Sequence, residues 1–264
     1  TTNSVAAGVS DFRVNAAKLG RTSSGGVQPL AVQALITTSA QQAGLFLSTG
    51  GNINLGGGGS GLFTIEVAGN LGSRELSFAS GTTVAQIVAA VNTYSDVTGV
   101  SATAYTSGGT TDGLRLRSTD FGSDAFVSVK VVNAANIQGT QVGIYNLLAT
   151  DANSPSTSSP TLFTATGASN GVRDIGQDLV ATINGVAATA KGKTARINSD
   201  FLDVEVTFNT STAQAVGAVN AFTITGGGAE FQLASKVDIG GKVAVGIQNV
   251  AARKLGNSTL GFLA

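Results

Sequence analysis

The sequence predicts an α+β fold that is mainly β, with antiparallel-rich sheets, one short amphipathic helix and two subdomains. Three observations favour this fold: apolar and polar residues alternate along most readable segments, one segment has helical spacing, and two loop-like segments interrupt the pattern. A period of two places one face of each strand in a core. With 264 residues, of which 42% are hydrophobic, the chain can bury one large core or two ordinary ones.

The alternation is clearest in two segments, each with one apolar face: Phe63, Ile65 and Val67 in 62–67, and Leu202, Val204, Val206 and Phe208 in 202–208. Similar runs lie at 114–117, 126–132, 180–183, 221–225 and 243–247. Because β-branched residues suit half-buried pleated surfaces, we expect all seven segments to form strands. Parallel and antiparallel pairing leave similar patterns, so the topology stays open.

One helix is predicted by the spacing of Val84, Ile87, Val88 and Val91, which recur at i, i+3, i+4 and i+7 and so share a face. Thr83 and Gln86 have the spacing of a capping box at its start. The segment 30–47 is rich in Ala, Gln and Leu, which also suit a helix, but its alternation favours a strand.

Two segments mark the predicted boundaries. The glycine-rich segments 50–51 and 56–61 indicate a mobile loop, and the Ser/Thr/Pro segment 153–160 does not have the residues to pack a core. We therefore expect one subdomain made of 1–45 with 136–264, and a second, motif-bearing subdomain at 46–135 inserted into it.

Composition excludes several function classes. The chain has no cysteine, histidine, methionine or tryptophan, which rules out a Ser-His-Asp triad, a Cys-His dyad and His- or Cys-ligated metal sites. Fifteen basic and fifteen acidic residues leave no net field for nucleic acid or an anionic membrane. No apolar stretch approaches the roughly 20 residues of a membrane helix. Because methionine is absent, we interpret the sequence as an internal fragment or a processed chain.

Two glycine motifs suggest phosphate binding but lack its other parts. The triplet Gly192-Lys193-Thr194 has Ala187 where a phosphate loop needs glycine, and a strand-like segment follows it. We interpret it as a polar hairpin turn. The cluster 56–61 has neither a lysine nor a βαβ unit beside it, so we interpret it as a flexible loop.

Two carboxylate pairs also suggest functional sites but lack the other features that such sites need. Asp203 and Glu205 share one face of a strand and are typical of a solvated surface rather than a glycosidase pair. Asp120 and Asp124 flank Gly122 without EF-hand spacing, so a turn is favoured over a calcium site. We therefore predict no catalytic, cofactor-binding or metal-binding residues, and no enzyme activity.

Other polar and aromatic residues leave alternatives open. Arg115 and Arg117 point to one side of a strand, where they meet acidic groups of a neighbouring subunit or keep a sheet face wet and guard an edge. Segments 209–211 and 257–259 match the N-glycosylation pattern. The only tyrosines, Tyr94, Tyr105 and Tyr145, are scattered in the sequence, which argues against a concave aromatic surface for binding sugars.

Some of these segments resemble a known family. The segments 64–78 and 98–103, with the helix end Val91-Asn92 between them, resemble the repeat motif inside bacterial flagellins and some flagellar hook-associated proteins. Residues 181–185 look like the start of a second, weaker copy. The segments 222–233, 245–248 and 255–256 are similar to the part through which long flagellins return from their outer domains to the filament core.

The resemblance implies a structural subunit of the flagellar filament, secreted and extracellular, that serves motility. Flagellins begin and end with long heptad helices, which this sequence lacks, so it corresponds to the surface-exposed middle region of flagellin. The implied partners are other flagellin subunits, assembled into a helical filament through those missing termini, and O-linked glycans on exposed hydroxyls such as those of 154–161. The alternatives are a hook-associated or filament-cap protein, a secreted adhesin-type binding module and, third, an enzyme.

Overall fold

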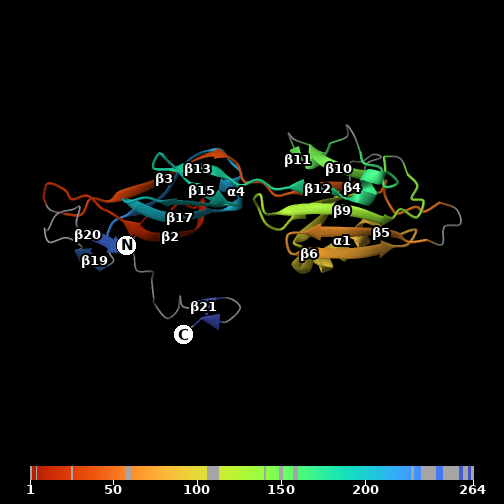
Figure 1. Cartoon of the computed structure of the whole chain (residues 1–264), viewed down its shortest axis with the longest axis horizontal. Helices are drawn as coiled ribbons and strands as arrows, with labels where there is room; N and C mark the ends of the chain where they lie inside the picture. Colours follow the sequence, from red (N-terminus) through yellow and green to blue (C-terminus); the bar gives the residue numbers. More distant parts are fainter. Residues whose placement is uncertain are drawn as a thin grey trace. The chain divides into compact units, whose positions relative to one another are not determined.

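The chain is described by a computed structural model, which is mainly β, as the sequence predicts (Figure 1). It describes residues 2–3, 5–24, 26–56, 61–105, 113–139, 141–148, 151–156, 160–226, 229–232, 242–245, 256–257 and 261–262. All strand pairs within these residues are antiparallel. The chain divides into two compact units: unit 1 is 1–39 with 179–264, and unit 2 is 40–178.

Unit 2 is longer than the predicted inserted subdomain, 46–135. Its added strands include β10 (Gly143–Leu148), which pairs with β4 (Gly44–Ser48), and β12 (Val172–Ile175), which pairs with β9 (Phe126–Asn133). The segment 153–160 is therefore not at a unit boundary. Residues 151–155 form β11 (Asp151–Pro155) beside β10, and Pro155 is buried, while 157–159 lie outside the described residues.

Two antiparallel sheets build unit 2. One has five strands in the order β11-β10-β4-β8-β7, and the other has four in the order β12-β9-β5-β6. The remaining strands and the helices of the unit are β5 (Phe63–Gly69), β6 (Gly72–Phe78), β7 (Val100–Tyr105), β8 (Gly113–Ser118), α1 (Val84–Thr93), α2 (Ser95–Thr98) and α3 (Thr166–Asn170).

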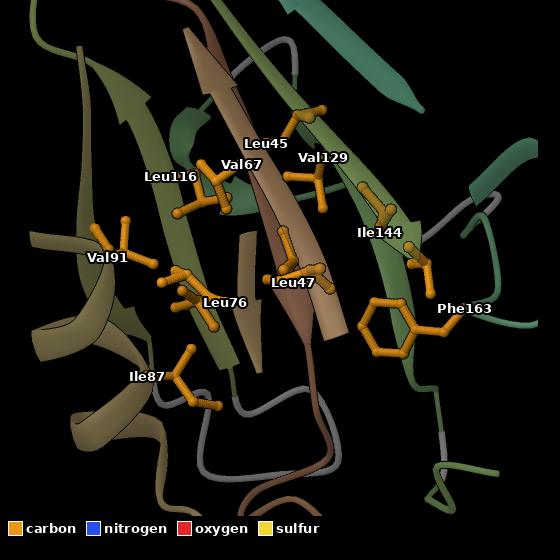
Figure 2. Packing of buried hydrophobic residues seen from close by; sticks show 14 of the residues in the cluster. Leu45, Leu47, Val67, Leu76, Ile87, Val91, Leu116, Val129, Ile144 and Phe163 are labelled. Atoms are coloured by element: carbon orange, nitrogen blue, oxygen red, sulfur yellow. The ribbon is translucent and has the colours of Figure 1, made fainter. Parts of the chain in front are cut away.

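A single apolar cluster joins both sheets and α1, as Figure 2 shows. The predicted face of β5 is confirmed, because Phe63, Ile65 and Val67 are each buried. From α1, the buried residues are Ile87 and Val91, two of the four that set its helical period. Removal of this apolar surface from water is the main stabilising contribution to the unit.

The start of α1 is the capping box that the sequence predicts. The backbone N–H of Gln86 donates to Thr83 Oγ1 at 3.3 Å, and the backbone N–H of Thr83 donates to Gln86 Oε1 at 2.9 Å. Two backbone N–H groups that a helix start otherwise leaves without partners are thereby satisfied.

We expect Thr83→Ala to lower the free energy of unfolding of unit 2 by about 1 kcal/mol, because it removes this cap. All three tyrosines lie in unit 2 and the chain has no tryptophan, so tyrosine fluorescence during urea unfolding reports this unit. Thr83→Ser keeps the hydroxyl and should stay near the wild-type value. Equal losses in both variants would contradict a capping role.

Unit 1 contains two larger sheets and a short pair. The first has the order β1-β18-β3-β13-β14, with strands β1 (Thr2–Asn3), β18 (Gly217–Ile224), β3 (Leu30–Thr38), β13 (Val180–Ile183) and β14 (Val186–Ala187). The second has the order β15-β16-β17-β2-β20-β19, with strands β15 (Thr189–Lys191), β16 (Thr194–Asn198), β17 (Leu202–Phe208), β2 (Val9–Ala17), β20 (Lys242–Val245) and β19 (Ala229–Gln232). The pair is β21 (Gly256–Asn257) with β22 (Gly261–Phe262), and α4 (Thr210–Ala213) follows β17.

The two larger sheets of unit 1 meet through their apolar faces. The ring centroids of Phe12 in β2 and Phe222 in β18 lie 4.5 Å apart, which joins one sheet to the other. The predicted inward set of β17 is confirmed, since Leu202, Val204, Val206 and Phe208 are all buried. Segment 30–47 forms β3 and β4, so the helical alternative is wrong there.

Strands are also found at the other predicted segments. Segments 114–117, 126–132 and 180–183 lie in β8, β9 and β13, and 221–224 lies in β18. The run 243–247 overlaps β20 as far as Val245, and 246–247 lie outside the described residues. The loop prediction for 56–61 falls mostly on 57–60, which also lie outside them.

Candidate interaction surfaces

Gly192 and Lys193 form a turn between β15 and β16, as the sequence indicates, and Thr194 begins β16. Gly192 has φ +57°, and its carbonyl accepts a hydrogen bond from Leu179 N at 3.0 Å. Lys193 Nζ donates to Thr210 Oγ1 at 3.2 Å. A phosphate loop leads into a helix, whereas this turn leads into a strand.

The predicted carboxylate pairs lie on surfaces and in turns. Asp203 accepts hydrogen bonds from Arg196, at 3.3 Å from Nη2 to Oδ2, and from Asn15 Nδ2 at 3.1 Å. Asp120 Oδ2 accepts from Asn70 Nδ2 at 3.0 Å. Among the described residues, no group of three or more acidic side chains is placed to hold a metal ion.

Arg115 and Arg117 lie on β8, which runs between β4 and β7, so the alternative that they guard a sheet edge is wrong. The structure brings Asn153 of β11 to them: its Oδ1 accepts from Arg115 Nη1 at 2.7 Å and from Arg117 Nη2 at 3.5 Å. The sequence pattern did not point to Asn153, because the two segments are 36 to 38 residues apart.

Two of the three tyrosines contact the same phenylalanine, although they are far apart in the sequence. Tyr105 and Tyr145 both make edge contacts with Phe46, with ring centroids 5.0 Å and 6.1 Å away. Tyr145 is buried, its hydroxyl donates to the carbonyl of Gln141 at 2.7 Å, and burial raises the pKa of its phenol. Because Phe46 is buried as well, this group is a packed cluster rather than an open platform for sugars.

Of the candidate glycosylation sites, Asn209 lies wholly within the described residues. Asn209 caps α4 through Oδ1, which accepts from Thr212 N at 2.9 Å, and its Nδ2 donates to the carbonyl of Ala7 at 2.9 Å. A sugar on Nδ2 would displace the second bond. Within 154–161, residues 157–159 lie outside the described part of the chain, as do 258–259 of the second N-glycosylation pattern.

Unit 1 has one exposed sheet face without charge. Strands β18, β3, β13 and β14 contain no Asp, Glu, Lys or Arg at all. We call the solvent-facing side of these strands the neutral face; its residues are Ala31, Gln33, Leu35, Thr37, Val180, Thr182, Ala187, Ala218, Asn220 and Thr223. Leu35 is 46% exposed and lies directly between its cross-strand partners Ala218 and Thr182.

The second sheet of unit 1 has the opposite character. Its solvent-facing side, the charged face, carries Asp11 and Arg13 of β2, Arg196 of β16, and Asp203 and Glu205 of β17. Arg196, Glu205 and Arg13 are direct neighbours across three strands, which places opposite charges side by side. This arrangement is typical of a surface that stays in water. The neutral face departs from it, and the lack of charge in four strands is the signal in the sequence that could have located this face.

The remaining strong signal is the segment that resembles a flagellar repeat. Residues 52–120 match the family model of the flagellin hook IN motif. Residues 52–120 therefore carry a flagellar motif. The match spans β5, β6, α1, α2, β7 and β8, and so covers both segments, 64–78 and 98–103, on which the resemblance depended. The return-like segments at 222–256 lie outside it.

The matched motif has a definite structural role in unit 2. Asn92, at the end of α1, fixes the helix to β7: its Nδ2 donates to the carbonyl of Ala102 at 3.0 Å, and its Oδ1 accepts from Ala102 N at 2.8 Å. The side chain therefore takes the place of a backbone neighbour for β7, which is otherwise an edge strand. No described helix is long and apolar enough to cross a membrane.

Among solved structures, the chain is similar to domains of flagellar cap proteins. The D2-D3 domains of FliD from Serratia marcescens match at 16% identity and a TM-score of 0.43, over 75% of this chain and 92% of that one. The D2-D3 domains of FliD from Escherichia coli match at 17% identity and a TM-score of 0.41, over 84% and 95%. FliD (HAP2) from Pseudomonas aeruginosa PAO1 matches at 16% identity and a TM-score of 0.42, over 81% and 85%. No curated protein matches the chain. Because each TM-score is below 0.5, these likenesses carry no assignment of a role to the chain.

Proposed function

We propose that the chain is the outer region of a hook-associated or cap protein of the bacterial flagellum, where it works as a structural part through contacts with other subunits. The observation that carries the proposal is the hook IN motif, which supplies six of the elements of unit 2. The motif resemblance extends to both flagellins and hook-associated proteins, but the segments that resemble flagellin specifically, 222–256, are outside the match.

Two structural features support a mechanical role. Unit 2 encloses one continuous apolar cluster, and close-packed interiors of this kind resist compression. Unit 1 divides its outside into a charged face that suits water and a neutral face that suits contact with protein. Repeated subunits then add many weak contacts through tethering, so no single interface has to be strong.

The second candidate is the surface-exposed middle region of flagellin itself. Support for it comes from the resemblance of 222–233, 245–248 and 255–256 to the segments that return from the outer domains of long flagellins. The two candidates differ in where along the flagellum the chain would be found.

Immunogold electron microscopy of intact flagella, with antibodies raised against the purified chain, separates the candidates. We expect gold particles at the filament tip or at the junction between hook and filament. Label along the whole filament would instead support the flagellin candidate. An absence of label, with an anti-flagellin antibody binding normally on the same grids, would contradict both.

A further inference from the structure

We propose that the neutral face of unit 1 pairs with the same face of a second copy of this chain. This inference rests on the proposed function, since it names the surface and the partner through which the subunits would make contact. It starts from the ten solvent-facing residues of the neutral face, none of which is charged although the other large sheet of the same unit carries charged residues of both signs on its outer side. Protein interfaces are depleted in charge at their centres, and exposed sheet faces normally are not.

Charge complementarity favours a second copy as the occupant. A partner with a charged surface would bury its charges against alanine, threonine and leucine side chains, which offer no opposite charge. The neutral face has no such cost against itself. Each of the other larger sheets in the described part of the chain contains charged residues in at least two strands, for example Arg115 of β8 and Arg173 of β12. The matching surface on this molecule is therefore the same neutral face.

The shape of the neutral face also suits sheet-on-sheet packing. Most of its side chains are small, and the two longest are those of Gln33 and Leu35 on β3. Leu35 lies in the row between Ala218 and Thr182. Two such faces can approach closely, with each Leu35 over the small residues of the other copy. Extended sheets pack in this way at a separation of about 10 Å.

The size of the neutral face predicts a weak interface. Strands of eight, nine, four and two residues, at about 4.8 Å between strands and 3.3 Å per residue, give a flat area of roughly 370 Å² per copy. Two copies together reach roughly 700 Å², below the ~1,200 Å² of stable complexes. We therefore expect a dissociation constant of about 0.1–1 mM for the free chain, a strength that becomes effective only when subunits are held together.

Sedimentation equilibrium of the purified chain tests this pairing across that concentration range. We expect a monomer–dimer equilibrium, and we expect Leu35→Glu to weaken it at least about ten-fold, because each copy would bury a carboxylate. Val132→Glu is the matched control: Val132 is 49% exposed on β9 of unit 2, close to the 46% of Leu35. A monomeric wild-type chain, or equal weakening by both variants, would overturn the proposal. The proposal would also be overturned if the chain did not self-associate and Leu35→Glu instead abolished its binding to another flagellar protein, because the neutral face would then bind that protein.

A second experiment, with introduced cysteines, tests the pairing without the Leu35→Glu variant, whose folding could differ from that of the wild-type chain. Because the chain has no cysteine, a single introduced thiol reports contact between copies. Under mild oxidation, Thr182→Cys on the neutral face should form disulfide-linked dimers at least about ten-fold faster than Thr207→Cys on the charged-face sheet. Equal rates would contradict the pairing. Failure of immunogold labelling would contradict the proposed function without affecting these solution results. A monomeric chain would contradict only the pairing.

Discussion

Replacement of Phe163 by alanine is expected to lower the free energy of unfolding of unit 2 by about 4 kcal/mol. Phe163 is 1% exposed, and its ring centroid lies 4.9 Å from that of Phe63 on β5. It comes from the turn before α3, outside both the matched motif and the predicted subdomain 46–135. Its removal leaves a cavity between segments that are far apart in the sequence, and a rigid sheet cannot close around such a cavity.

Urea unfolding followed by tyrosine fluorescence measures this loss, because the three tyrosines report unit 2. Leu162→Ala is the matched control: Leu162 is the preceding residue and is 50% exposed, so its truncation should cost less than about 0.5 kcal/mol. If both variants unfolded at the wild-type urea concentration, the segment 136–178 would not belong to the core of unit 2, and the boundary predicted at 135 would be restored.

Gly69→Ala is expected to cost about 3 kcal/mol, through a clash rather than a cavity. Gly69 ends β5 at the hairpin to β6, where α2, β7 and β9 converge. An added Cβ would overlap the carbonyl oxygen of Thr98 and lie 2.8 Å from Val100 Cγ2 and 3.2 Å from the carbonyl oxygen of Phe126. Two of these three contacts are backbone atoms of packed elements, so the strain cannot be relieved by rotating a side chain.

Gly81→Ala separates this clash from the conformational cost of replacing a glycine. Gly81 has φ +86° and no atom within 4 Å of an added Cβ, so its substitution should cost about 1 kcal/mol from backbone strain alone. Tyrosine fluorescence again reports both variants, since both residues lie in unit 2. A smaller loss for Gly69→Ala than for Gly81→Ala would show that the crowding around Thr98 relaxes at little cost.

The local features of the fold could be predicted from the sequence because each depends on near neighbours. The alternation in 202–208 placed Leu202 and Phe208 in the core, and the Thr83–Gln86 spacing placed the start of α1 at the residue where the structure has it. The motif segments 64–78 and 98–103 were recognised in the same way, since β5, β6 and β7 carry their pattern within single strands.

The sequence by itself therefore determined a mainly β fold, the inward face of each strong strand and the flagellar motif. Only the tertiary structure decided that β10, β12 and Phe163 complete unit 2, that Arg115, Arg117 and Asn153 meet, and that four uncharged strands form one continuous neutral face. The physical reason is that periodicity arises from neighbours along the chain, whereas a strand's partner is selected by hydrogen bonds and apolar contacts between segments far apart in it. Such pairings leave no local pattern in either segment.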